Sequence, residues 1–325
     1  MANITDDGTK HHLHLELNPI EKKKTVFRKV KAKIELPELP EPLPMSPSDH
    51  LIITHSRRVR AADFSEPWFI ERSKELNFGF PLVLHRKLWE FAVITQVYRD
   101  RIAGGGRVLG FGCGIEPLPA YFAGQCASVV ATDYTSDAWR SANQQSRSRD
   151  DLPYVGVCDR EQMAYQVEFR EVDMRDIPID LRSGEFDFVW SSSSMEHLGS
   201  LQAGIDFVCS AMECLRAGGV AVHTTEFAYE SRASTKFKTL ESTDLSLYRG
   251  LDLVTLGVRL ENQGDRYLSP DNWTLKLADA DGSHPADSYV DHYPYNGSPE
   301  GWHLNLDIAG WKSTSVALVA IRGGV

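Results

Sequence analysis

Three glycines at alternate positions are the first residues of this chain whose types and spacing indicate chemistry. Gly110, Gly112 and Gly114 follow the apolar pair Val108-Leu109, and Pro117 suits the first turn of a helix beginning just after them. The pattern predicts a buried strand, a tight turn and a helix. Because glycine has no side chain and a helix N-terminus presents unpaired N–H groups, a ligand can lie directly against this backbone.

The spacing excludes two common ligands of such turns. The dinucleotide fingerprint G-x-G-x-x-G would need its last glycine where Ile115 or Pro117 stands. A phosphate-binding loop needs Gly-Lys followed by Ser or Thr, and the turn lacks that sequence. What remains is a ligand with a ribose and no pyrophosphate.

Two aspartates at predicted strand ends extend this site. Asp133 closes the next strand 19 residues after Gly114, where a carboxylate can accept hydrogen bonds from both ribose hydroxyls. Asp173, with Met174 beside it, closes the third strand, where the edge of an adenine would lie. Either aspartate could instead cap a helix or hold a turn, and Ser136 competes with Asp133 for the cap.

Strands and helices that alternate along the chain must position these residues. Apolar runs predict strands at 108–109, 128–132, 167–172, 186–191, 220–224, 273–278 and 313–321. Helical spacing predicts helices at 67–76, 81–102, 136–143, 201–215 and 245–260. The alternation predicts an α/β fold with a parallel sheet, right-handed crossovers and a ligand site at the carboxyl ends of the strands.

Two parts of the chain do not follow this alternation. Residues 1–80 are predicted to be an N-terminal extension with a proline-rich connector, and residues 81–325 the main domain. The segment 25–36 could be an edge strand, which could also pair with a second subunit in a homodimer. Residues 279–311 form a long loop whose aromatic content argues against disorder and favours a functional role.

The composition excludes several classes of function. A net charge of −10 and a pI near 5.6 argue against a nucleic-acid-binding surface, which needs clustered Lys and Arg. Five cysteines without CxxC spacing argue against a disulfide framework or a zinc site, and a reducing cytoplasm is the simplest location. The N-terminus is polar and no apolar run approaches about 18 residues, so we expect no signal peptide and no membrane span.

Several of these segments together resemble the ordered motifs of class I S-adenosylmethionine-dependent methyltransferases. The motifs are the turn at 109–114, Ala131-Thr132-Asp133, Val172-Asp173-Met174, the strand at 186–191 and Leu215-Arg216-Ala217-Gly218-Gly219. The similarity covers residues 82–325 and implies S-adenosylmethionine as the cofactor, with Tyr134 and Ser191 also near it. It also implies a doubly wound, Rossmann-like sheet of seven strands, mostly parallel and with the last strand antiparallel.

One departure from the family pattern concerns a carboxylate. The family usually carries an acidic residue where Gly110 stands and a third glycine where Glu116 stands, so the two are exchanged here. We hypothesise that Glu116 supplies the carboxylate that meets the ammonium group of the cofactor, directly or through water. The alternative is that Glu116 only complements the N-terminus of the following helix.

Methyl transfer to a hydroxyl needs an in-line nucleophile and a group that removes its proton. Glu196 and His197 follow the fourth strand at the ligand edge, and His197 is our leading candidate for the base. His197 could instead only hold its loop by hydrogen bonding. Glu226 ends the fifth strand and is better placed to contact the acceptor than His223, which that strand should bury.

The aromatic loop is expected to close the acceptor pocket. It contributes flat faces beside hydrogen-bonding groups, which suits a sugar or a similar polyol, from Tyr289, Asp291, His292, Tyr293 and His303. The alternative is that these residues pack over the sheet edge. Asp291 and His292 have no identifiable third partner, so we expect no metal.

The sequence therefore predicts O-methylation of a carbohydrate or a small polar metabolite. Segments 86–91, 110–119, 194–199 and 222–226 more narrowly resemble a bacterial subgroup that is often encoded beside surface-polysaccharide genes. Two alternatives stay open. One is an N- or C-methyltransferase of natural-product biosynthesis, and the other is a non-catalytic scaffold that retains the methyltransferase fold.

Overall fold

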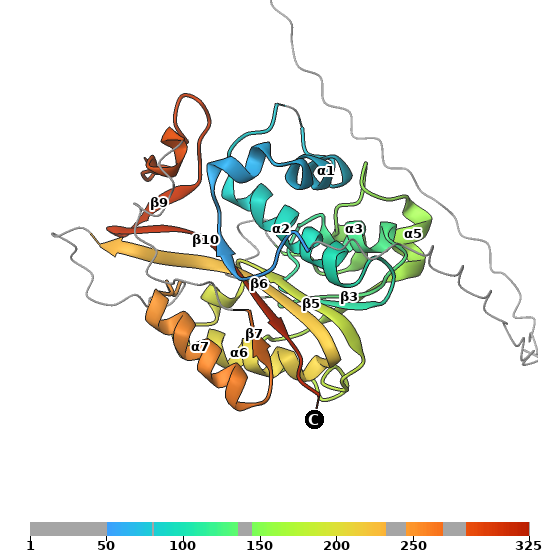
Figure 1. The fold of residues 1–325 in the computed structure, drawn as a ribbon. Helices are drawn as coiled ribbons and strands as arrows, with labels where there is room; N and C mark the ends of the chain where they lie inside the picture. The colour runs from blue at the N-terminus through green and yellow to red at the C-terminus, as the bar shows by residue number, and fades with distance from the viewer. Residues whose placement is uncertain (1–50, 80, 136–144, 232–244, 269–283, 325) are drawn as a thin grey trace, which may run out of the picture. The chain divides into compact units, whose positions relative to one another are not determined.

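A computed structural model describes residues 51–79, 81–135, 145–231, 245–268 and 284–324 (Figure 1). The predicted helix at 136–143 and the predicted strands at 25–36 and 273–278 lie outside these residues. The described residues form a ten-stranded sheet with helices on both faces. The α/β prediction is confirmed, whereas the predicted count of seven strands is wrong.

Five parallel strands carry the glycine turn. Their order is β4, β3, β2, β5 and β6, and each neighbouring pair is parallel. Helices cover both faces of these strands, which explains apolar runs such as Val-Val-Ala in β3. The bounds are β2 Arg107–Phe111, β3 Ser128–Asp133, β4 Val167–Glu171, β5 Phe186–Ser192 and β6 Leu215–Ser231.

The remaining strands surround β10. β10 (Trp311–Ile321) runs antiparallel to β6, as predicted for the last strand. β9 (Asn305–Ile308) pairs antiparallel with β10, and β8 (Val290–Asp291) is parallel to β9. β1 (Arg57–Arg58) and β7 (Arg266–Tyr267) also pair with β10. Sequence periodicity does not reveal strands of two to four residues, which explains why the strand count is too low.

The strands β6 and β10 continue beyond the parallel strands. β5 pairs with β6 as far as Thr224, whereas the pairing of β6 with β10 continues to Ser231. β9 and β8 add to this projecting part (Figure 1). We call residues 225–231 and 311–316, with β8 and β9, the ribbon extension. Of these parts, β8 and β9 lie within the segment 279–311, for which an irregular loop was predicted.

Helices on the two faces bury two separate cores. Strand residues alternate between them, so that Val108 packs in one core and Leu109 in the other. One face carries α1 (Pro67–Glu75), α2 (Arg86–Arg101), α3 (Leu118–Gly124) and α5 (Arg160–Gln166), and the other α6 (Leu201–Ala211) and α7 (Gly250–Asn262) (Figure 1). Short 3-10 turns are η1 Ala61–Ser65, η2 Arg149–Asp151, η3 Met195–His197, η4 Met212–Cys214 and η6 Pro285–Asp287.

The predicted helix bounds need three corrections. α2 and α7 each begin five residues later than predicted. For α2 the reason is His85, whose Nδ1 accepts a hydrogen bond from the Lys87 N–H at 3.1 Å and caps the helix. The helix predicted at 201–215 ends at Ala211, and a 3-10 turn leads into β6. Leu215 is apolar in either element, so periodicity alone cannot place this boundary.

Residues 51–79, which the sequence assigns to the extension, pack against α2 and β10. Asp63 is buried and accepts a hydrogen bond from Trp89 Nε1 of α2 at 2.7 Å. It also forms an ion pair with Arg57 at 2.5 Å. The Val59 N–H donates to the Ser315 carbonyl of β10 at 3.0 Å. This segment therefore helps to fix the start of α2 against the sheet.

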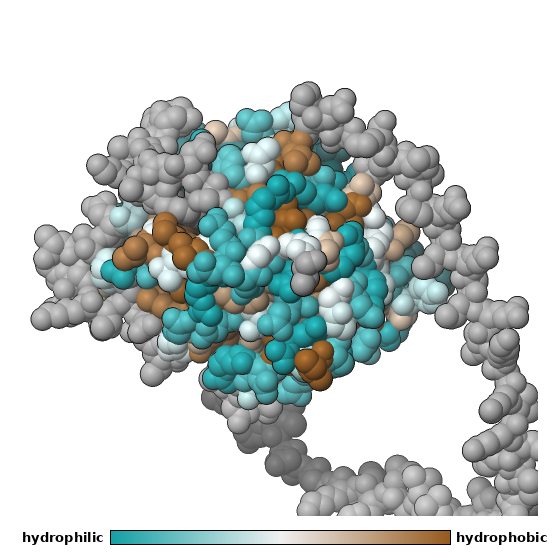
Figure 2. Space-filling view, turned by 60° about the horizontal axis from the view of Figure 1, so that its bottom comes forward, coloured by the Kyte–Doolittle hydropathy of each residue, from teal (hydrophilic) through white to brown (hydrophobic). Residues whose placement is uncertain are grey.

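The face on which α6 and α7 lie is mainly hydrophilic, with apolar side chains gathered in separate groups (Figure 2). On α7, Leu251, Val254 and Val258 are exposed and share one side of the helix. Among the described residues, no helix combines the length and the apolar character that a membrane crossing needs.

Candidate active site

A cavity of about 890 Å³ opens at the carboxyl ends of β2, β3, β5 and β6. Its lining combines the glycine turn, the ends of β3 and β5, the start of α2 and part of the ribbon extension. Small-molecule sites in proteins usually measure about 300–1,000 Å³, and open α/β sheets bind ligands at this edge. The cavity thus lies where the sequence predicts the ligand site.

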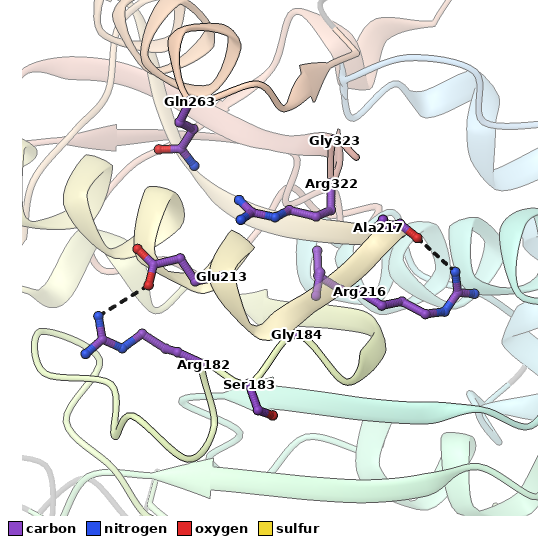
Figure 3. Close-up of a pocket in the computed structure, with 10 residues that line it drawn as sticks. Arg182, Ser183, Gly184, Glu213, Arg216, Ala217, Gln263, Arg322 and Gly323 are labelled. Atoms are coloured by element: carbon purple, nitrogen blue, oxygen red, sulfur yellow. Dashed lines mark hydrogen bonds and ion pairs between the residues drawn. The ribbon is translucent and has the colours of Figure 1, made fainter. Parts of the chain in front are cut away.

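A second cavity, of about 510 Å³, lies at the opposite edge of the sheet, beside the starts of β5 and β6 (Figure 3). Each of its three arginines is paired with a carboxylate: Arg182 with Glu213, Arg216 with Asp187 and Arg322 with Asp265. These pairs neutralise the arginine charges. The larger cavity is therefore the candidate site.

The glycine turn forms one wall of the larger cavity. Gly112 and Gly114 have φ angles of +60° and +49°, which L side chains rarely adopt. A Cβ at Gly112 would also lie 2.6 Å from Ser194 Oγ. The Cys113 N–H donates to the Thr132 carbonyl at 2.9 Å and fastens the turn to β3. The turn thus presents bare backbone to the cavity, as the sequence predicts.

Asp133 faces the cavity from the end of β3. Its carboxylate accepts hydrogen bonds from the N–H groups of Gly114 (3.2 Å), Tyr134 (2.9 Å) and Ser146 (3.0 Å). Burial raises the pKa of Asp133, while these three hydrogen bonds act in the opposite direction. A carboxylate has about four lone-pair sites, so this one keeps capacity for a ligand. Tyr134 also lines the cavity and is exposed, whereas Ser136, the competing cap, lies outside the described residues.

Asp173 and Met174 line the cavity as well. The Asp173 carboxylate accepts hydrogen bonds from Arg175, from Nε at 3.0 Å and from Nη2 at 2.7 Å. These hydrogen bonds lower the pKa of Asp173, so it is ionised at neutral pH. The Met174 side chain is buried beside the glycine turn, where its Sδ would lie 3.4 Å from a Cβ at Gly112.

Two of the predicted cofactor residues lie behind the wall of the cavity. A Cβ at Gly110 would lie 2.2 Å from the Trp190 ring, so this glycine makes room for an indole. The Ser191 hydroxyl is buried and forms a hydrogen bond with His223 Nδ1 at 2.8 Å. Burial lowers the pKa of His223 to about 3, which keeps this histidine neutral inside the sheet.

Glu116 is in the wall itself. It is buried, and its Oε1 accepts a hydrogen bond from Trp190 Nε1 at 2.7 Å. Burial raises the pKa of Glu116 to about 8, although the Trp190 hydrogen bond and the charge of Lys87 act in the opposite direction. This carboxyl group therefore changes its charge near neutral pH.

The carboxylate of Glu90, in α2, interacts with several polar groups beneath the cavity. It is fully buried, and its carboxylate pairs with Arg86 at 3.2 Å and with Lys87 at 3.0 Å. Four hydroxyl groups also donate to it, from Ser192, Ser193, Thr224 and Ser315. Burial raises the pKa of Glu90, but the two cations and the hydroxyls outweigh it and lower the pKa to about 2. The sequence prediction missed this residue, although Arg86, Lys87 and Glu90 have the spacing of neighbours on one helix face.

Two further carboxyl groups line the cavity at its other end. Glu196 Oε2 accepts a hydrogen bond from Thr225 Oγ1 at 3.0 Å, while its buried Oε1 has no partner among the described residues. Glu226 forms an ion pair with Arg86 at 2.6 Å. Burial raises the pKa of both glutamates, and in Glu226 it outweighs the charge of Arg86. His197 lines the cavity beside Glu196.

The aromatic loop contributes His303 and Tyr295 to the cavity. His303 Nδ1 lies 2.5 Å from Oδ2 of the buried Asp291, which also accepts a hydrogen bond from the Gly297 N–H at 2.8 Å. The His303 ring stacks on His85 at 4.5 Å between centroids. A histidine held at Nδ1 by a carboxylate can exchange a proton at Nε2.

The other residues predicted for the acceptor are outside the cavity lining. Tyr289 packs against Trp302, with 6.1 Å between ring centroids. His292 lies 3.4 Å from Asp307, and the Tyr293 side chain is 83% exposed. In the part of the chain that the structure describes, no group of three His, Cys, Asp or Glu residues could hold a metal ion.

The cavity is thus built on a strand, glycine turn and helix, with carboxylates after the neighbouring strands. Residues 109–223 match the family of methyltransferase domains. The matched residues include the glycine turn, Asp133, Asp173 and Glu196, and the match supports S-adenosylmethionine as the cofactor. Among curated proteins, none shows significant sequence similarity to this chain.

Several solved structures are similar to this chain at low identity. Phosphoethanolamine N-methyltransferase 2 from Haemonchus contortus, in complex with S-adenosylmethionine, is 16% identical over 68% of this chain and 49% of that one, with a TM-score of 0.40. An S-adenosylmethionine-dependent methyltransferase from Mesorhizobium loti is 14% identical over 67% and 92%, with a TM-score of 0.37. The 4+2 cyclase SpnF is 15% identical over 79% and 94%, with a TM-score of 0.42. This chain spans about half the length of the first of these, and such likenesses do not indicate a substrate.

Proposed function

We propose that this chain transfers a methyl group from S-adenosylmethionine to an oxygen of a carbohydrate or a small polar metabolite. The observation that carries the proposal is that one cavity has two chemically different ends. One end, at β2 and β3, offers bare glycine backbone and Asp133, and the other, at β5 and beyond it in the strand order, offers Glu196, Glu226 and His303. The flat ring of Tyr295 beside the hydrogen-bonding His303 in the lining favours a carbohydrate acceptor.

The residues at the first end fit the cofactor. Gly112 and Gly114 line the cavity without a side chain, and Asp133 keeps acceptor capacity for ribose hydroxyls. Met174 provides an apolar surface for the adenine, and Glu116 provides a carboxylate for the ammonium group. S-adenosylmethionine, when bound, supplies a methyl group on a positively charged sulfur, which is a good leaving group.

The residues at the second end orient the acceptor and remove its proton. One buried oxygen of Glu196 has no partner among the described residues and can accept a hydrogen bond from an acceptor hydroxyl. Burial raises the pKa of Glu196, which brings it closer to the range in which a carboxylate is an effective base. We assign Glu196 and His197 to proton removal, and Glu226 and His303 to acceptor binding.

The test is release of S-adenosylhomocysteine by the full chain, using a panel of sugar nucleotides, free sugars and glycans. Turnover with a sugar hydroxyl supports the proposal. Turnover only with amines or activated carbons would replace it by an N- or C-methyltransferase. No turnover combined with no cofactor binding in calorimetry would leave the non-catalytic scaffold as the function.

A further inference from the structure

The exchanged positions of glycine and glutamate are linked through one tryptophan. Gly110 and Trp190 are direct neighbours on the paired strands β2 and β5. A Cβ at Gly110 would lie 2.2 to 2.5 Å from three atoms of the indole, namely Cζ2, Cε2 and Cη2. Any side chain at position 110, including the acidic one usual in the family, would require the indole to move.

The indole has a fixed orientation in the core. Trp190 is fully buried, and its ring packs against Phe122 with 4.6 Å between centroids. Its ring nitrogen is a donor only, and here it donates to Glu116 Oε1 at 2.7 Å. Because the indole cannot rotate freely in a packed core, this bond fixes one oxygen of Glu116 in the wall of the cavity.

We infer that Trp190 is a positioning residue of the cofactor site. Its indole N–H orients the Glu116 carboxylate toward the ammonium group of the cofactor, and Gly110 is the residue that makes room for the indole. Gly110, Trp190 and Glu116 thus together replace the single acidic residue that the family usually carries at the position of Gly110 in β2. The inference rests on the proposed function, because it concerns the same cofactor.

The arrangement makes cofactor affinity depend on pH. The pKa of Glu116 is about 8, so the group is mostly protonated at pH 6.5 and mostly ionised at pH 8.5. An ammonium group prefers the ionised carboxylate, so affinity rises over this interval. The polar and titratable groups that act on Glu116 are Lys87 and Glu90 from α2, Asp133 from β3, Trp190 from β5 and Cys113 from the glycine turn. Loss of the indole N–H removes a group that stabilises the ionised form and moves the rise in affinity to higher pH.

The experiment is calorimetric titration of the full chain with S-adenosylhomocysteine at pH 6.5, 7.5 and 8.5. For the unaltered chain we expect affinity to rise on the order of tenfold between pH 6.5 and 8.5, and for Glu116→Gln no such rise. For Trp190→Phe we expect roughly tenfold weaker binding at pH 7.5 and a rise displaced to higher pH. Glu116→Asp keeps the charge but withdraws the carboxylate from the indole, and should behave like Trp190→Phe.

The matched control is Trp89→Phe. Trp89 is also fully buried and also donates its Nε1–H to a carboxylate, Asp63, at 2.7 Å, but this pair does not line the cavity. Trp89→Phe should therefore leave both the affinity and its pH dependence unchanged. Circular dichroism establishes which variants are folded. If Trp190→Phe does not fold, Glu116→Asp alone tests the inference.

The outcomes separate the inference from the proposed function. Wild-type affinity and pH dependence in both Trp190→Phe and Glu116→Asp would overturn the positioning role, provided that the unaltered chain binds S-adenosylhomocysteine. An equal effect of Trp89→Phe would also overturn it, because the loss would then be a general effect on the core. Failure of the unaltered chain to bind S-adenosylhomocysteine at every pH would instead refute the proposed function, and the inference with it.

Discussion

The charge of Glu90 should contribute a large part of the stability of this fold. Glu90 is fully buried and is the shared partner of Arg86 and Lys87. Glu90→Gln keeps the size of the side chain and one of its two hydrogen-bond acceptors, but removes the negative charge that Lys87 and Arg86 share and leaves Arg86 paired with Glu226 alone. We therefore expect this single substitution to lower the free energy of unfolding substantially.

The magnitude follows from the lowered pKa. Glu90 has a pKa of about 2 in the folded chain, against 4.5 for an ordinary glutamate. At about 1.4 kcal/mol for each pH unit, this difference stabilises the folded state by about 3 kcal/mol at neutral pH. Because the folded-state pKa is the lower one, this stabilisation is complete above the unfolded-state pKa of 4.5 and is lost as the pH falls toward 2. At pH 3 about half of it should remain.

Urea unfolding of the full chain, followed by circular dichroism between pH 7 and pH 3, measures this contribution. Glu90→Gln should be less stable by about 3 kcal/mol at pH 7, and the difference should narrow as the pH falls. Glu261→Gln is the control, since Glu261 is exposed on α7 and should change stability by less than about 0.5 kcal/mol. A Glu90→Gln chain as stable as the unaltered one at pH 7 would refute the assigned role of the charge.

Two further predictions concern packing and the acceptor end. Gly110→Ala places a methyl group 2.2 Å from the Trp190 ring and should lower the free energy of unfolding by about 1–3 kcal/mol. Gly79→Ala should not lower it, because no atom of the described residues lies within 4 Å of a Cβ at Gly79. Urea unfolding measures both changes in stability, and equal losses for the two substitutions would contradict the prediction. His303→Gln should raise the KM for the acceptor at least about tenfold without changing S-adenosylhomocysteine affinity, and Asp291→Asn should have a smaller effect in the same direction. Steady-state kinetics and calorimetry measure the two quantities, and a loss of cofactor affinity would instead place His303 at the cofactor end.

The part of the cavity that we propose holds the cofactor could largely be placed from sequence, because its elements are local. The glycine turn, β3 with Asp133 and β5 are each recognisable within a short segment, and parallel pairing brings their carboxyl ends to one edge. Once the alternation of strands and helices is recognised, no long-range information is needed to place these residues.

The acceptor end depends on contacts between distant parts of the chain. Ser315 donates to Glu90 across 225 residues, and no local pattern in the sequence links the two residues. In the part proposed for the cofactor, the close approach of Gly110 to Trp190 also could not be predicted locally, because it depends on which strands are neighbours in the sheet. In the aromatic loop, β8 and β9 are too short to leave a periodic pattern, so residue types alone did not separate His303, which lines the cavity, from the exposed Tyr293.

The ribbon extension carries one group of cavity-lining residues, and the parallel strands carry the other. The glycine turn and Asp133 depend on the parallel strands, whereas Glu226 and His303 depend on the part of β6 that continues beyond β5 and on the strands paired there. Substitutions can therefore accumulate in one part during evolution without changing the other. On the proposed function, insertions and substitutions in the ribbon extension can change which molecule receives the methyl group without altering the residues that hold the donor. In protein engineering, the ribbon extension of a relative could be joined to the parallel strands of this chain at the point where β6 continues beyond β5.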